Sequence, residues 1–163
     1  MSRDRIVITG ASGTLGSALV AHFAPEWDVV QLDEEPPESE KQEGLGEAHI
    51  GSFLDPVLVR DALAGATAVV HSGAIPGSRP PLREVVAANV QGTFNVLEAA
   101  GESPSVERFV YISSIMQHGF HDDPPGSNIP PCLPIHEDLP PLTEDCYGTT
   151  KVQAEQWCRR YAG

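Results

Sequence analysis

Basic side chains are scarce in this sequence of 163 residues. It has 10 lysines and arginines against 23 aspartates and glutamates, and its formal net charge is −13. Binding to nucleic acid or to an anionic membrane surface relies on clustered basic side chains. The sequence therefore predicts no nucleic-acid partner and no membrane partner.

Cysteines are also few. There are three, with no CxxC pair: Cys132, Cys146 and Cys158. An odd, scattered set favours a reduced, cytoplasmic compartment over a disulfide framework. Four possible metal ligands fall in one segment: His118, His121, Cys132 and His136. Their spacing matches no familiar zinc pattern, so no metal site is expected.

Long apolar runs are absent as well. The longest apolar stretches are interrupted by Arg60, Asp61 and His71, so no segment is expected to cross a membrane. A chain of this length is expected to form one domain, residues 1–163, that can bury a sizeable core.

The chain does have a regular alternation of two kinds of segment. Short apolar runs predict five strands, at residues 6–9, 28–32, 48–51, 67–71 and 108–113. Periodicity and capping residues predict helices at residues 14–23, 55–64, 82–100 and 147–161. This alternation predicts an α/β fold of the Rossmann type, with a parallel sheet in the order 3-2-1-4-5 and helices on both faces. The Pro-rich loop 115–146 is unusually long, and such loops often form active-site lids.

The first predicted strand leads into three glycines with the spacing G-x-x-G-x-x-G: Gly10, Gly13 and Gly16. In this interpretation Gly10 allows the tight turn, Gly13 lets the backbone approach a pyrophosphate, and Gly16 lets the helix pack closely. The helix N-terminus offers N–H groups and a positive dipole end to phosphates. Further candidate contacts in this turn are Ser12, Thr14 and Leu15. The plainer alternative is a structural turn without a ligand.

Asp33 supports the interpretation as a dinucleotide site. It ends the second predicted strand, 23 residues after Gly10, where an acid can accept a hydrogen bond from the ribose 2′-OH. Glu34 and Glu35 follow it, so a 2′-phosphate would meet three acids. The sequence therefore predicts NAD in preference to NADP. The alternative role for Asp33 is a simple cap on the strand.

Ordered motifs along the whole chain resemble one family. They are TGASGTLG at 9–16, GSFLDP at 51–56, HSGAIPG at 71–77, NVQGTFNVLEAA at 89–100, YISS at 111–114 and YGTTK at 147–151. The chain resembles an extended short-chain dehydrogenase/reductase of the NAD-dependent epimerase/dehydratase family, from residue 6 to about residue 162.

The resemblance implies further cofactor contacts. Ser52 and Phe53 would lie near the adenine, and residues 71–74, with Ser72, Gly73 and Ala74, would line the cofactor. Asn89 would help to organise the active site, with helix capping as the alternative. The chain departs from the family at position 52, where an acid is usual, and at Ser72-Gly73, where Leu-Ala is commoner.

Tyr147 and Lys151 are four residues apart and so share a face of the last predicted helix. A free tyrosine has a pKa of about 10, too high for a good base at neutral pH. The Lys151 ammonium and the nicotinamide charge would favour the phenolate, so Tyr147 could move a proton while the cofactor moves a hydride. Lys151 would also bind the nicotinamide ribose. By spacing alone, such a pair is common on ordinary surface helices.

Ser114 is the expected third catalytic residue, with Ser113 as its close competitor. The family pattern Ser-x-x-x-Tyr-Gly maps onto residues 114–119, with His118 in place of the tyrosine. The Ser114 hydroxyl would bind the reacting oxygen at the end of the fifth strand. His118 could contact substrate or have no role, and Glu137 could serve as an extra acid or base.

These expectations lead to a hypothesis about function. The chain would be an NAD-dependent oxidoreductase or epimerase acting on a secondary alcohol of a sugar or sugar nucleotide. The alternative is a nucleotide-binding regulatory or interaction module without turnover. Full-length relatives continue with further strands and a substrate-binding region, so a fragment or truncated form with an open edge at the fifth strand is expected. The alternatives are a domain completed by a partner and a natural short form. Helices 82–100 and 147–161 correspond to a pair that forms dimers in many relatives.

Overall fold

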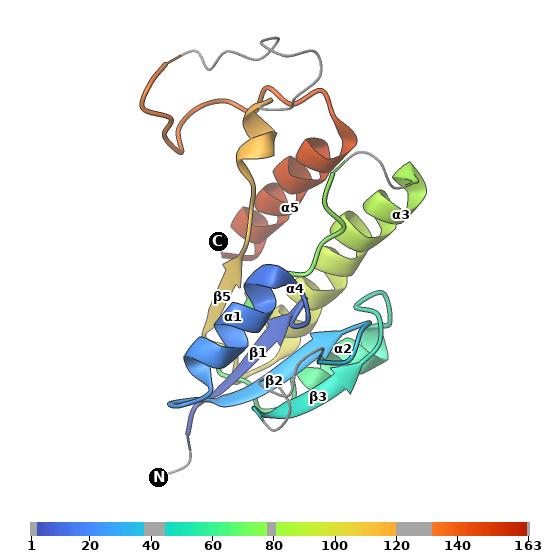
Figure 1. The fold of residues 1–163 in the computed structure, drawn as a ribbon, viewed down its shortest axis with the longest axis vertical. Helices are drawn as coiled ribbons and strands as arrows, with labels where there is room; N and C mark the ends of the chain where they lie inside the picture. Colours follow the sequence, from blue (N-terminus) through green and yellow to red (C-terminus); the bar gives the residue numbers. More distant parts are fainter. Residues whose placement is uncertain (1–2, 38–44, 78–80, 120–131, 163) are drawn as a thin grey trace.

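The computed structural model describes residues 3–37, 45–77, 81–119 and 132–162 (Figure 1). Five strands form one sheet: β1 (Arg5–Thr9), β2 (Asp28–Asp33), β3 (Glu47–Ile50), β4 (Ala68–His71) and β5 (Arg108–Tyr111). All neighbours pair in parallel, in the order β3-β2-β1-β4-β5. The predicted topology is confirmed.

Helices cover both faces of the sheet, as predicted. On one face, Ile6, Ile8 and Val29 pack with Val20 of helix α1 (Thr14–Phe23). On the other face, Val7 and Val30 pack against α2 (Pro56–Ala62) and α4 (Thr93–Glu102). Helix α5 (Cys146–Ala162) packs beside α4. The strands are apolar at successive positions because both faces of a parallel sheet are buried.

The predicted single helix over residues 82–100 is interrupted. Helix α3 (Leu82–Val86) passes into a π-helical segment, η1 (Ala87–Gly92), before α4 begins. Gly92 closes this segment against Phe53, since an added Cβ would lie 2.2 Å from a ring carbon of Phe53. Single π turns are rare and occur inside α-helices, so a continuous helix was the expectation from the sequence.

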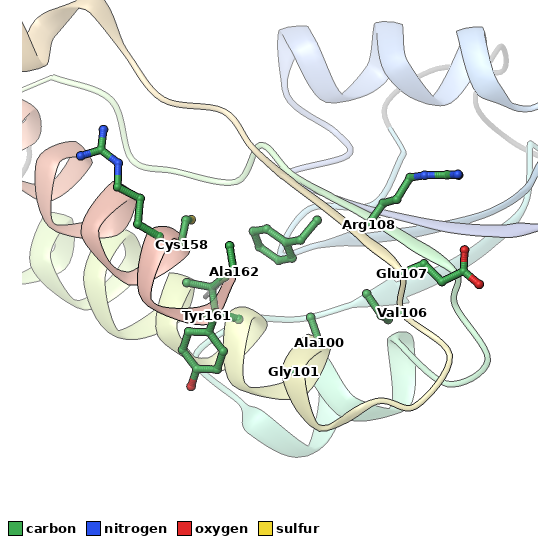
Figure 2. A pocket seen from close by; sticks show the side chains of 11 residues that line it. Ala100, Gly101, Val106, Glu107, Arg108, Cys158, Tyr161 and Ala162 are labelled. Carbon is green, nitrogen blue, oxygen red and sulfur yellow. The ribbon is translucent and has the colours of Figure 1, made fainter. Parts of the chain in front are cut away.

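Strand β5 is shorter than predicted and lies at an edge of the sheet. It ends at Tyr111, so Ser114 does not end the strand but caps a 3-10 turn, η2 (Ile115–His118). Beyond Ile112, whose N–H still donates to His71 O at 3.0 Å, the segment leaves the sheet. A groove of about 550 Å³ runs along this edge, and Figure 2 shows Ala100, Val106 and Tyr161 on its wall.

The loop predicted over residues 115–146 begins with η2. Its later part returns to η2, because the N–H groups of Leu142 and Thr143 both donate to Gln117 O, at 3.0 and 3.2 Å. Residues 120–131, including His121, lie outside the described residues, so the lid stays a prediction. Among the helices that the structure describes, none is long and apolar enough to cross a membrane.

Candidate active site

The glycine turn is closed by backbone contacts that leave no room for a side chain. Gly10 has a φ of +67°, and an added Cβ would lie 2.5 Å from Gly73 Cα. An added Cβ on Gly16 would lie 1.9 Å from Gly10 O. Gly16 therefore lets α1 pack against the turn itself. Gly13 is the N-cap of α1, and it has no side chain that could accept a hydrogen bond. The N–H groups of the first turn, including those of Thr14 and Leu15, therefore have no side-chain cap.

Beside this turn lies a pocket of about 340 Å³. These predicted cofactor residues line it: Gly10, Ser12, Gly13, Asp33, Phe53, Ser72, Gly73 and Ala74. Glu34, Glu35, Ile75 and Ala88 complete its wall. The ends of β1, β2 and β4 thus meet at one pocket, which is where parallel sheets place ligands. Ser52 lies outside this wall, and its hydroxyl accepts from Leu54 N at 3.3 Å.

Asp33 is tied to the glycine turn. Its Oδ2 accepts from Ser12 N at 2.8 Å and its Oδ1 from Glu35 N at 3.2 Å. An ionised carboxylate has about four acceptor positions, so both oxygens can still accept from a ribose hydroxyl. The acids at 33–35 also make this end of the pocket negative, which suits a ribose without a 2′-phosphate.

His71 does not line the cofactor pocket, contrary to the expectation for residues 71–74. Its side chain is fully buried, with Nδ1 2.6 Å from Thr9 Oγ1 and Nε2 2.8 Å from Thr93 Oγ1. Burial, and then the charge of Lys151, lower the pKa of His71 to about 3. The neutral ring thus joins β1 to α4. Thr9 in turn positions the pocket loop, because its hydroxyl accepts from Gly73 N at 3.3 Å.

Asn89 acts from behind the pocket. Its Oδ1 accepts from Ile75 N at 2.8 Å, and its Nδ2 donates to Ile75 O at 3.0 Å and to Thr150 Oγ1 at 3.2 Å. The amide therefore joins the pocket wall at Ile75 to α5 beside Lys151. It lies within the π-helical segment, so the alternative of helix capping does not describe it. The organising role expected for Asn89 stays a prediction.

Tyr147, Lys151 and Ser114 come together at the end of β5. Lys151 Nζ lies 5.5 Å from the centroid of the Tyr147 ring and 4.8 Å from that of Tyr111, and it donates to Ile112 O at 2.9 Å. Ser114 lies close enough to the Tyr147 hydroxyl to lower its pKa. Its competitor Ser113 faces elsewhere and donates to Glu155 Oε1 at 2.6 Å. The two serines thus have different side-chain partners, and the choice of Ser114 stays a prediction.

Burial governs the ionisation of this cluster. It lowers the pKa of the Lys151 ammonium to about 8. It also raises the pKa of Tyr147, and the Ser114 hydrogen bond lowers that pKa while Asp145 raises it. Among the protein's own groups the net direction is upward, which differs from the lowered pKa expected from the sequence. Only added positive charge near the ring would therefore bring the pKa of Tyr147 down and stabilise its phenolate.

The start of α5 shows why Tyr147 is held firmly. Asp145 Oδ1 accepts from Gly148 N at 2.9 Å, and its Oδ2 accepts from Thr143 Oγ1 at 2.8 Å. An added Cβ on Gly148 would lie 2.1 Å from Thr143 Oγ1, so only glycine fits after Tyr147. Sequence reasoning missed Asp145, although an aspartate just before a helix is a recognisable capping signal.

A second pocket, of about 630 Å³, adjoins Ser114. Glu137 and His118 lie on its wall, so both keep their candidate status. His118 is buried, and its Nδ1 lies 3.3 Å from Pro140 O, which can only accept. Within the described ranges, no group of three or more His, Cys, Asp and Glu side chains is arranged to hold a metal ion, and His121 lies outside them.

The class that this fold and site define is the short-chain dehydrogenase/reductase superfamily. A superfamily member from Agrobacterium tumefaciens, solved with bound NAD, superposes with a TM-score of 0.82 at 33% identity over 96% of this chain and 44% of its own. The model of the NAD-dependent epimerase/dehydratase family matches residues 6–163, and the chain belongs to that family. NAD is the cofactor of this family, and the glycine turn and Asp33 fit it.

Two further relatives are also linked to NAD. The NAD-dependent glucose-6-phosphate dehydrogenase of Haloferax volcanii is 28% identical over 96% of this chain and 62% of its own length. The Bordetella bronchiseptica enzyme WbmG, solved with NAD, has a TM-score of 0.81 at 28% identity over 98% of this chain and 50% of its own. The chain thus spans about half to three-fifths of the length of these relatives, which are dehydrogenases and related enzymes.

Proposed function

We propose that the chain is the NAD-binding part of an oxidoreductase or epimerase that works at a secondary alcohol of a sugar or sugar nucleotide, with Tyr147 as general acid/base. One observation carries the proposal. Lys151 Nζ lies 5.5 Å from the centroid of the Tyr147 ring, and Ser114 lies close enough to the Tyr147 hydroxyl to lower its pKa. A hydroxyl, a phenol and an ammonium at the carboxyl end of a parallel strand suit proton transfer at an alcohol.

Each residue has a definite task in this proposal. Bound NAD would supply the hydride acceptor or donor. Tyr147 takes the proton from the substrate hydroxyl during oxidation and returns it to the oxygen during reduction. Because burial raises the pKa of Tyr147, the phenolate depends on the Lys151 ammonium and on the hydrogen bond that Ser114 donates. With a pKa of about 8, Lys151 is still mainly protonated at neutral pH.

Cofactor binding divides among the glycine turn, the side chains of the pocket beside it, and Lys151 on α5. The N–H groups of the first turn of α1, from Thr14 to Gly16, would bind the pyrophosphate, since the Gly13 N–H already donates to Gly10 O at 3.1 Å. Asp33 accepts from the ribose hydroxyls of the adenosine half, and Phe53 lies near the adenine. Lys151 binds the nicotinamide ribose. Three acids at residues 33–35 favour NAD over NADP, since a 2′-phosphate would be repelled.

A sugar substrate is supported by the relatives. Among them are proteins named L-arabinose 1-dehydrogenase, from Haloferax volcanii, and uronate dehydrogenase, from Pseudomonas syringae. A similar solved structure, MoeE5, was determined with UDP-glucose and NAD. We place the substrate in the pocket beside Ser114, where Glu137 is available as an additional acid or base.

We also propose that a second copy of the chain packs on the helices 82–100 and 147–161. Phe94 of α4 packs edge-on to Trp157 of α5, with ring centroids 5.4 Å apart. Trp157 is still 41% exposed, and Leu82 and Val86 of the same helical layer are 58% and 46% exposed. Exposed apolar side chains gathered on neighbouring helices suit a dimer contact.

A cytoplasmic location fits the free cysteines.

Calorimetric titration with NAD, and with NADP in parallel, tests the cofactor part of the proposal. NAD is expected to bind at least tenfold more tightly than NADP, and Asp33→Asn is expected to reduce this preference. Equal binding of the two dinucleotides would refute the role of Asp33.

NAD reduction with a panel of sugars and sugar nucleotides tests the catalytic part. Tyr147→Phe is expected to reduce turnover by about 10²–10⁴-fold while NAD affinity changes little, because only the proton-transferring oxygen is removed. Retained turnover would refute the role of Tyr147. Tight NAD binding with no turnover on any substrate would favour the regulatory module instead.

A further inference from the structure

Glu155 lies on α5 one turn after Lys151, and its carboxylate faces the segment that follows β5. Oε1 accepts from Ser113 Oγ at 2.6 Å and from Gln117 Nε2 at 2.9 Å. Oε2 accepts from Arg159 at 3.2 Å. Only 23% of the Glu155 side chain is exposed. These contacts bracket Ser114, since Ser113 precedes it and Gln117 follows it in η2.

The segment over residues 112–117 needs such support. Strand β5 is at the edge of the sheet and ends at Tyr111. Its backbone hydrogen bonds to β4 therefore end at Ile112. From there, side chains of α5 hold the segment. Lys151 donates to Ile112 O, Glu155 accepts from Ser113 and Gln117, and Tyr147 lies close enough to Ser114 for that hydroxyl to lower its pKa. Tyr147, Lys151 and Glu155 follow one another at four-residue spacing, so they form one stripe of the helix.

We propose that Glu155 is a positioning residue that fixes Ser114 against Tyr147. This inference rests on the proposed function only where Tyr147 is given a role in proton transfer. The contacts of Glu155 themselves do not depend on a bound dinucleotide. The ordinary alternative is a surface ion pair with Arg159, which contributes little on its own. The two short bonds to Ser113 and Gln117 favour positioning, because a carboxylate that accepts from both sides of Ser114 restricts the turn between them.

Charge and positioning predict opposite effects on Tyr147. Two groups change the pKa of Tyr147: Ser114, which lowers it, and Asp145, which raises it, and the Lys151 ammonium lies 5.5 Å from the centroid of its ring. Loss of the Glu155 charge alone would make the phenolate easier to form and lower the pKa. Loss of the Ser114 hydrogen bond would raise it. The direction of the change therefore separates the two roles.

The experiment is a double-substitution cycle read by NMR. The chain has three tyrosines, so protein labelled at tyrosine Cζ gives three signals, which single Tyr→Phe variants assign. Glu155→Ala and Ser114→Ala are each expected to raise the pKa of Tyr147. In the Glu155→Ala background, Ser114→Ala is expected to have little further effect, because the bond it removes is already lost. Glu155→Gln, which keeps an acceptor, is expected to restore most of the wild-type behaviour.

Controls keep the outcome decisive. Arg159→Ala removes only the exposed partner and is expected to leave the pKa of Tyr147 unchanged. Ser113→Ala removes one of the two short bonds and gives the same direction as Glu155→Ala, should that variant fail to fold. An unchanged or lowered pKa in Glu155→Ala, or independent effects of the two substitutions, would overturn the proposal. Because the readout needs no turnover, an inactive wild-type protein would refute the proposed function but not the positioning.

Discussion

Replacing Lys151 by methionine is expected to change how the stability of the protein depends on pH. The ammonium is 2% exposed, and burial lowers its pKa from the ordinary value of 10.5 to about 8. Between these two pH values the unfolded chain binds a proton that the folded protein does not, so the free energy of unfolding rises with pH in that window. The full difference corresponds to about 3 kcal/mol at ~1.36 kcal/mol per pKa unit.

Methionine removes the titrating group while keeping a side chain of similar length. At neutral pH it relieves the cost of burying a charge but loses the hydrogen bond to Ile112 O, which is worth about 1–3 kcal/mol, so the two proteins should have similar stability. As pH rises from about 7.5 to about 9.5, the wild type should gain about 2 kcal/mol over Lys151→Met.

Urea unfolding of both proteins across this pH range measures the difference directly, since other titrating groups contribute alike to both. Arg159→Met is the matched control, because it removes an exposed cation that stays charged throughout. Its curve should run parallel to the wild type. Curves for wild type and Lys151→Met that stay parallel above about pH 8 would refute the buried-ammonium reasoning.

Three further predictions concern the turn, the buried histidine and the helical surface. Gly10→Ala and Gly65→Ala share nearly the same backbone, with φ of +67° and +71°, but an added Cβ meets Gly73 only at the first. In denaturant unfolding, Gly65→Ala should lower the free energy of unfolding by about 1 kcal/mol and Gly10→Ala by clearly more. Calorimetry should show loss of NAD binding only in Gly10→Ala. Equal losses of stability in the two variants would contradict this reasoning. His71, with a pKa lowered to about 3, contributes stability that is present above about pH 6.5 and lost as pH falls, because only the unfolded chain takes up the proton. Between about pH 6.5 and about pH 4.5 the wild type should lose about 2 kcal/mol relative to His71→Gln in urea unfolding, and identical slopes would argue against a buried neutral ring. In sedimentation velocity, Trp157→Ala should increase the fraction of monomer. Val57→Ala, which alters a 58% exposed side chain on α2, should leave that fraction unchanged. A wild-type protein that is already monomeric would rule out the proposed contact.

The sequence was informative wherever structure follows from nearby residues. Strand positions, the strand order and the N-cap of α2 at Asp55 were all predictable, because they depend on periodicity, short connections and local hydrogen bonds. The π-helical segment was not, because such turns are rare and lie within helices that otherwise have the ordinary pattern. The end of β5 was misjudged because its last residues face a side-chain network, not a neighbouring strand.

The candidate site divides in the same way. The sequence by itself determined the glycine turn, Asp33 and the four-residue spacing of Tyr147 and Lys151, since covalent spacing fixes which groups share a turn or a helix face. Only the tertiary structure joined Ser113 to Glu155, buried His71 between Thr9 and Thr93, and joined Asn89 to Thr150. Those partners lie tens of residues apart in the chain, so their contacts depend on how helices pack on the sheet, which no local pattern encodes.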